Sequence, residues 1–152
     1  MTNKDLRPAF PMLLLLEDDP AVRRSLQMIL QGQGFHVRAY GSAAMLLKDP
    51  DAAKAACLVT DYRLADANGI EVLTTLRGRG WPGPAILITG HGSRELGQRA
   101  LDASFAVIFE KPLRQFSLAK AARRLVHANE GESNKFPCEK VPRGMRQART
   151  KP

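Results

Sequence analysis

The sequence predicts an α/β fold, an open and doubly wound parallel sheet in which five strands alternate with five helices. Five short apolar runs lie along the first 129 residues, at 12–16, 35–40, 56–60, 85–89 and 105–109. Runs this short, each followed by turn residues, are typical of strands that are buried on both faces of a parallel sheet. The segments between them carry apolar residues at helical spacing. Five consecutive βα units therefore indicate one doubly wound sheet with right-handed crossovers.

The first helix has clear signals at both ends. Asp18 or Asp19 can cap it, and Pro20 suits its first turn. Gly32 and Gly34 are typical of its end. One apolar stripe runs between these signals, through Val22, Leu26, Ile29 and Leu30.

The four later helices also have start signals. Ser42 can cap a short second helix that runs through Leu47. Asn68 and Ser93 can cap the third and fourth, and the fifth begins after Pro112. Apolar residues recur at helical spacing in these last three helices: Ile70, Val72, Leu73 and Leu76; Leu96, Ala100 and Leu101; and Leu118, Ala122, Leu125 and Val126. Each helix thus has one face to bury against the sheet.

We expect one domain, at residues 12–129, between two segments of different character. The 152 residues are 44% hydrophobic and 25% charged, a globular composition that excludes wholesale disorder. Residues 1–11 are expected to be irregular. From residue 130 the helical pattern stops, while glycine and proline recur. Residues 130–152, with six basic and three acidic side chains, are therefore expected to form a disordered or loosely docked basic tail.

Composition also limits the class of protein. The two cysteines, Cys57 and Cys138, are too few for a disulfide framework and lack the spacing of metal ligands. No apolar stretch approaches the roughly 20 residues that a membrane span needs, and the run at 12–16 is too short for a signal peptide. We therefore expect a soluble, cytoplasmic protein with no membrane partner.

The net charge of +8 raises the question of a nucleic-acid or acidic partner, against the alternative of a solvated basic surface. Lys120, Arg123 and Arg124 give the fifth helix a basic face, and the tail continues this charge. However, the tail has a single aromatic residue, Phe136, and no recognition-helix pattern. Sequence-specific binding of nucleic acid by this chain alone is therefore not expected.

Polar groups gather where the predicted strands end. Glu17 and Asp18 follow the first strand, Asp61 follows the third, Thr89 ends the fourth, and Lys111 comes after the fifth. The carboxyl ends of parallel strands meet at one edge of the sheet, so these side chains are expected to converge there. Clustered carboxylates repel one another unless a cation neutralises them, and an all-oxygen set of ligands suits Mg²⁺.

Together these groups have the chemistry of phosphoryl transfer. Asp61 stands alone at the end of a central strand and is the best candidate nucleophile, able to form an acyl phosphate. Glu17 and Asp18 would hold the metal ion, which together with Lys111 would neutralise charge on the transferring phosphoryl oxygens. The Thr89 hydroxyl would donate a hydrogen bond to the new phosphoryl group.

The chain resembles the receiver domain of response regulators in two-component signalling. The resemblance covers residues 12–128 and is carried, in this order, by LLLLEDDPAVRRSL, LVTDYRLADANGIEVL, AILITGHGS and IFEKPL. It implies a flavodoxin-like (βα)5 sheet with the strand order 2-1-3-4-5. It also implies a histidine kinase as the partner, which donates the phosphoryl group from phosphohistidine. The segments TGHGS and QGQGFHVRAYGSAAMLL are similar to receivers that are usually fused to a helix-turn-helix output domain.

The resemblance also assigns individual roles. Asp61 would be the phosphoacceptor, Thr89 the switch hydroxyl and Lys111 the phosphoryl-binding lysine, with a cis bond to Pro112. Gly69 matches the glycine that ends the loop after the phosphoacceptor. The implied ligands of Mg²⁺ are Glu17, Asp18, Asp61 and the backbone carbonyl of Arg63.

This sequence departs from the family pattern at several positions. Ala65 stands where the family usually has proline, so the loop after Asp61 is expected to be less rigid. Ile108 occupies the position of the switch aromatic, and the adjacent Phe109 has the opposite strand parity and should point away from it. Arg63 and His91 would flank the phosphoryl group, where we expect them to restrict attacking water and lengthen the phosphorylated lifetime.

The leading hypothesis is a single-domain response regulator, since no output domain follows the fifth helix. It would not be an enzyme toward other substrates, because its chemistry would be limited to its own phosphorylation and dephosphorylation. Its output would be contact with a downstream protein, as a relay intermediate, a phosphate sink or a dimerisation switch. A homodimer would use the face of the fourth and fifth helices, with Phe116.

Three alternatives belong to other classes. A Mg²⁺-dependent phosphatase with an aspartate nucleophile would need a second aspartate at the position of Arg63. An FMN carrier would need a glycine- and hydroxyl-rich phosphate loop where residues 17–19 are acidic. A degenerate regulator would bind nucleic acid or a partner through the basic tail, with little phosphorylation switching.

Overall fold

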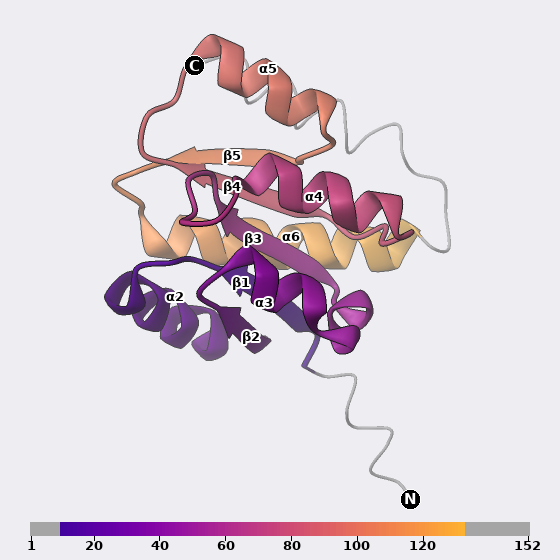
Figure 1. Cartoon of the computed structure of the whole chain (residues 1–152). Coiled ribbons are helices and arrows are strands. Elements are labelled where there is room, and N and C mark those ends of the chain that lie inside the picture. The colour runs from indigo at the N-terminus through magenta and orange to yellow at the C-terminus, as the bar shows by residue number, and fades with distance from the viewer. Residues whose placement is uncertain (1–9, 133–152) are drawn as a thin grey trace, which may run out of the picture.

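The computed structural model describes residues 10–132, and these form a parallel sheet with helices on both of its faces (Figure 1). The strands are β1 (Met12–Leu16), β2 (His36–Tyr40), β3 (Cys57–Asp61), β4 (Ala85–Thr89) and β5 (Val107–Glu110). The helices are α2 (Pro20–Gly32), α3 (Ala43–Lys48), α4 (Gly69–Gly78), α5 (Arg94–Asp102) and α6 (Gln115–Glu132), with a 3₁₀ turn, η2 (Pro50–Lys54), before β3.

The sheet has the order β2-β1-β3-β4-β5, and every neighbouring pair of strands is parallel. This confirms the predicted doubly wound fold and its strand order. The central strands are buried on both faces: Leu14 and Leu16 pack with the helices α3, α4 and α5, whereas Leu13 and Leu15 pack with α2 and α6. The continuous apolar runs in the sequence follow from this double burial.

The expected caps begin the helices where the sequence placed them. Asp19 accepts hydrogen bonds from the first turn of α2, and Ser42 and Ser93 each accept one from the first turn of α3 and α5. Asn68 caps α4 in a capping box with Glu71, so that two backbone N–H groups are satisfied reciprocally. These caps matter for function because α2, α4 and α5 each follow, after a loop, a strand end that carries polar groups.

The boundaries differ from expectation in two places. The turn η2 was not predicted; Asp49 caps it and Pro50 opens it, a local arrangement too short to produce a periodic pattern. Helix α6 continues to Glu132, past the predicted domain limit at residue 129, because backbone hydrogen bonds can continue after the apolar stripe has ended. The expectations for residues 1–9 and 133–152 lie outside the described residues. Among residues 10–132, no helix is long and apolar enough to cross a membrane.

Candidate functional site

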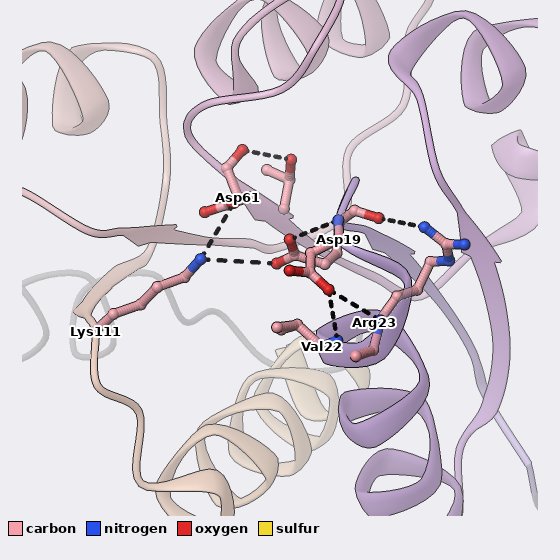
Figure 2. A network of polar contacts seen from close by, with 8 residues as sticks. Asp19, Val22, Arg23, Asp61 and Lys111 are labelled. Atoms are coloured by element: carbon pink, nitrogen blue, oxygen red, sulfur yellow. Dashed lines mark hydrogen bonds and ion pairs between the residues drawn. The ribbon is translucent and has the colours of Figure 1, made fainter.

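The carboxyl ends of β1, β3, β4 and β5 bring the predicted polar side chains to one edge of the sheet. Glu17 follows β1 and Asp61 ends β3, while Thr89 ends β4 and Lys111 follows β5. Figure 2 shows Lys111 extending across this edge toward Asp61. The ammonium nitrogen, Nζ, of Lys111 lies 3.3 Å from Asp61 Oδ2 and 3.9 Å from Glu17 Oε1. One lysine thus contacts carboxylates from two neighbouring strands.

Three carboxylates in this cluster could hold a metal ion. Glu17, Asp18 and Asp61 each offer an oxygen, and these oxygens all lie within 4.8 Å of one another. Glu17 Oε2 accepts a hydrogen bond from the backbone N–H of Asp19, but the buried Oε1 has no hydrogen-bond partner. A buried carboxylate oxygen that accepts no hydrogen bond is costly, and a hard cation would satisfy it. The residues present therefore fit a divalent metal ion of the magnesium type.

Burial controls the charge of this cluster. Glu17 and Asp61 are almost completely buried, with exposed fractions of 2% and 6% for the whole residues. Desolvation raises the pKa of Asp61 above its ordinary value, and nearby Lys111 offsets part of this rise. Burial likewise raises the pKa of Glu17, opposed chiefly by the hydrogen bond from Asp19. Without a bound metal ion, ionising Glu17 and Asp61 therefore opposes folding.

Metal-free protein is expected to lose stability, relative to a Glu17→Gln variant, as the pH rises above about 4.5, the ordinary pKa of glutamate. Folding raises the pKa of Glu17, so binding of its proton stabilises the folded state. This contribution to the free energy of unfolding is fully present below pH 4.5 and is lost as the pH rises through the folded-state pKa. Urea unfolding at a series of pH values, with a chelator present, measures this difference. The exposed Glu95 provides the matched control, Glu95→Gln. A Glu17→Gln protein that follows the wild type at every pH would contradict the prediction.

The loop after Asp61 is compact, and its last residues lie close to the end of β3, where the loop begins. The backbone N–H of Gly69 donates to the carbonyl of Tyr62, and Arg63 forms an isolated antiparallel bridge with Asn68. A Cβ on Gly69 would lie 2.7 Å from the carbonyl oxygen of Asp61, so only glycine fits where this loop closes against the strand. The side chain of Arg63 is exposed. A metal-binding role for its carbonyl stays a prediction.

The loop after β4 holds the predicted hydroxyl. Thr89 is buried, and its Oγ1 accepts a hydrogen bond from the backbone N–H of His91 at 3.2 Å. One residue of this region was missed by the sequence analysis: Glu110 Oε2 accepts a hydrogen bond from the backbone N–H of Gly92 at 3.0 Å. The register pairs Glu110 with Thr89, a signal that becomes visible only once β4 and β5 are known to be neighbours. The His91 side chain is exposed, and its effect on phosphorylated lifetime stays a prediction.

The fifth strand bears out the expected parity. Ile108 is half-buried and packs against the core beneath α3, α4 and α5. Phe109 packs against the opposite core, beneath α2 and α6. The aromatic ring next in sequence therefore does not replace the ring that Ile108 lacks. The bond between Lys111 and Pro112 is cis, as the resemblance implies.

Comparison with known proteins identifies the family. The model of the response regulator receiver domain matches residues 13–123. The chain belongs to this family. The receiver domain is 35% identical over 109 residues to the transcriptional regulatory protein FixJ of Azorhizobium caulinodans, a match that covers 72% of this chain and 52% of FixJ. It is 31% identical over 112 residues to the response regulator protein TodT of Pseudomonas putida, covering 74% of this chain and 49% of TodT.

Solved structures agree with this assignment. A CheY-like receiver domain protein from Methanospirillum hungatei has a TM-score of 0.75 at 24% identity, covering 81% of this chain and 98% of that protein, which supports the fold. The structure named FixJ-N has a TM-score of 0.68 at 33% identity, covering 77% of this chain and 94% of that protein. The receiver domain thus spans about half the length of the curated relatives it matches, but nearly all of these isolated domains.

Proposed function

We propose that this receiver domain accepts a phosphoryl group on Asp61 from a histidine kinase, with Mg²⁺ bound at the acidic cluster. One observation carries the proposal: the buried Asp61 carboxylate lies 3.3 Å from Lys111 Nζ and within metal-bridging distance of Glu17 and Asp18. A nucleophile, a fixed cation and further metal ligands are the parts that phosphoryl transfer to a carboxylate needs. Membership of a family of response regulators agrees with this chemistry.

The proposed step transfers the phosphoryl group between two nucleophiles. An oxygen of Asp61 forms a bond to phosphorus, and the bond from phosphorus to the phosphohistidine nitrogen breaks, leaving its electron pair on that nitrogen. Lys111 remains in place to bind a phosphoryl oxygen, and the Thr89 hydroxyl donates a hydrogen bond to another. The metal ion, when bound, neutralises charge that the transferring group spreads over its oxygens.

We further propose that the phosphorylated form acts by binding a protein, as a relay intermediate, a phosphate sink or a homodimer, and that it does not act on other substrates. Drawing Thr89 toward a phosphoryl group would move the loop that Glu110 contacts, and this loop leads directly into α5. Near the start of α6, Phe116 has an exposed fraction of 67% and offers an apolar contact. The exposed sides of α5 and α6, two helices that pack on opposite faces of the sheet, are thus the candidate contacts for a downstream partner or a second copy.

A second candidate is a degenerate receiver that binds its partner with little phosphorylation switching. Ile108 supports this candidate, because an aliphatic side chain has no ring to move between exposed and buried positions. In that case the basic tail could supply the contact with nucleic acid or a partner, but it lies outside the described residues.

Phosphorylation should occur when the protein is incubated with Mg²⁺ and a small acyl phosphate, and a chelator should abolish it. Intact mass measures the reaction, and one added phosphoryl group per chain is the expected result. The metal dependence follows from the mutual repulsion of three carboxylates, which a cation must relieve before an anionic donor can approach. No added mass, from the acyl phosphate or from an active histidine kinase, would overturn the proposal in favour of the degenerate receiver.

A further inference from the structure

Asp66 belongs to the loop after Asp61, but its carboxylate contacts a different element. The backbone N–H of Ala43 donates to Asp66 Oδ1 at 3.0 Å, and that of Ala44 donates to Oδ2 at 3.1 Å. These two amides open α3, and the first amides of a helix have no partner within it. Ser42 Oγ accepts from the next amide, that of Met45. One carboxylate therefore joins the phosphoacceptor loop to a helix more than 20 residues earlier in the chain.

In the tip of the loop, Leu64 and Ala67 pack against the core beneath α3, α4 and α5, whereas Asp66 is exposed. At the base of the loop, the backbone N–H of Gly69 donates to the carbonyl of Tyr62. Within the tip, the N–H of Leu64 donates to the carbonyl of Ala67 at 3.2 Å. Between these, Ala65 is exposed and has no ring to restrict its backbone. The two hydrogen bonds that Asp66 accepts join the loop tip to the start of α3. The same bonds hold the pKa of Asp66 below its ordinary value, so the side chain is charged at neutral pH and is favoured at the helix start.

We propose that Asp66 is a positioning residue for the metal and phosphoryl site. By joining the loop tip to α3 through these hydrogen bonds, Asp66 holds residues 62–65 in one conformation beside Asp61. This restraint compensates for the backbone freedom at Ala65. The site then binds Mg²⁺ without first having to order this loop, which raises its affinity. This inference rests on the proposed function, since it assumes that the acidic cluster binds Mg²⁺. Coupling is reciprocal, so metal binding must in turn steady the start of α3.

Replacing Asp66 with alanine is expected to raise the dissociation constant for Mg²⁺ about tenfold, the lower end of the range for residues that orient metal ligands. Asp66→Asn keeps one acceptor and should give a smaller increase. Ser42→Ala is the matched control, because it removes a cap from the same helix without touching the loop. Its Mg²⁺ affinity should equal that of the wild type. Calorimetric titration of the unphosphorylated protein measures all four constants.

Amide hydrogen exchange supplies a readout that does not depend on phosphorylation. In the wild type, Mg²⁺ should slow exchange at the amides of Ala43 and Ala44, and in Asp66→Ala it should have no effect there. Equal Mg²⁺ affinity in Asp66→Ala and wild type, or an equal loss in Ser42→Ala, would overturn the inference but leave the proposed function standing. If the wild type itself bound no Mg²⁺, both would fail together.

Discussion

Replacing Asp61 with asparagine is expected to slow phosphorylation by at least about a thousandfold, because loss of a nucleophile costs more than loss of a group that orients it. The asparagine amide is a poor nucleophile, and it removes the negative charge that faces Lys111 across 3.3 Å. The side chain is buried and similar in size, so the fold should persist. Intact mass followed over time with Mg²⁺ and an acyl phosphate measures the rate.

Asp19 offers a matched control for this variant. It lies in the same acidic sequence, but it is exposed and serves as the cap of α2, accepting hydrogen bonds from the N–H groups of Ala21 and Val22. Asparagine caps a helix about as well as aspartate does, so Asp19→Asn should be phosphorylated at the wild-type rate. If the Asp61→Asn protein gained a phosphoryl group as fast as this control, the nucleophile would have to be another residue.

The main parts of the site could be predicted because the chemistry follows directly from the topology. Once Asp61, Thr89 and Lys111 are each assigned to the end of a parallel strand, the sheet brings them to one edge whatever the loops do. The helix caps at Asp19 and Asn68 were predictable for a similar reason, since each cap acts within its own first turn. Interactions that are local, or that the sheet order dictates, are visible in the sequence.

Contacts that depend on the path of a loop could not be predicted. Asp66 and Glu110 are acidic residues on the surface, and no pattern distinguishes them from solvated carboxylates. Their roles appear only when the loop after β3 meets α3 and when β5 lies beside β4. Arg77 is a similar case, because it donates to the carbonyls of Trp81 and Gly83 and to the Ser104 hydroxyl. In each case the partner is set by tertiary packing.

Replacing Trp81 with alanine is expected to lower the free energy of unfolding by about 3–5 kcal/mol, the usual range for a large aromatic side chain removed from a core. Trp81 has an exposed fraction of only 4%, and its indole N–H donates to the carbonyl of Ala55 at 2.9 Å. The guanidinium of Arg77 lies 5.3 Å from the ring centroid and would lose this partner as well. Urea unfolding of the two proteins measures the difference.

Trp81→Phe separates packing from hydrogen bonding, because it keeps most of the apolar ring but leaves the carbonyl of Ala55 without its donor. Its expected cost is about 1–3 kcal/mol, that of one buried group left unsatisfied. Trp81 and Ala55 precede β4 and β3, so they lie at the opposite end of the sheet from Asp61. Under conditions in which both variants remain folded, each should therefore be phosphorylated at the wild-type rate. Slower phosphorylation of folded Trp81→Phe would mean that the two ends of the sheet are coupled, contrary to a site held by its own loops and strand ends.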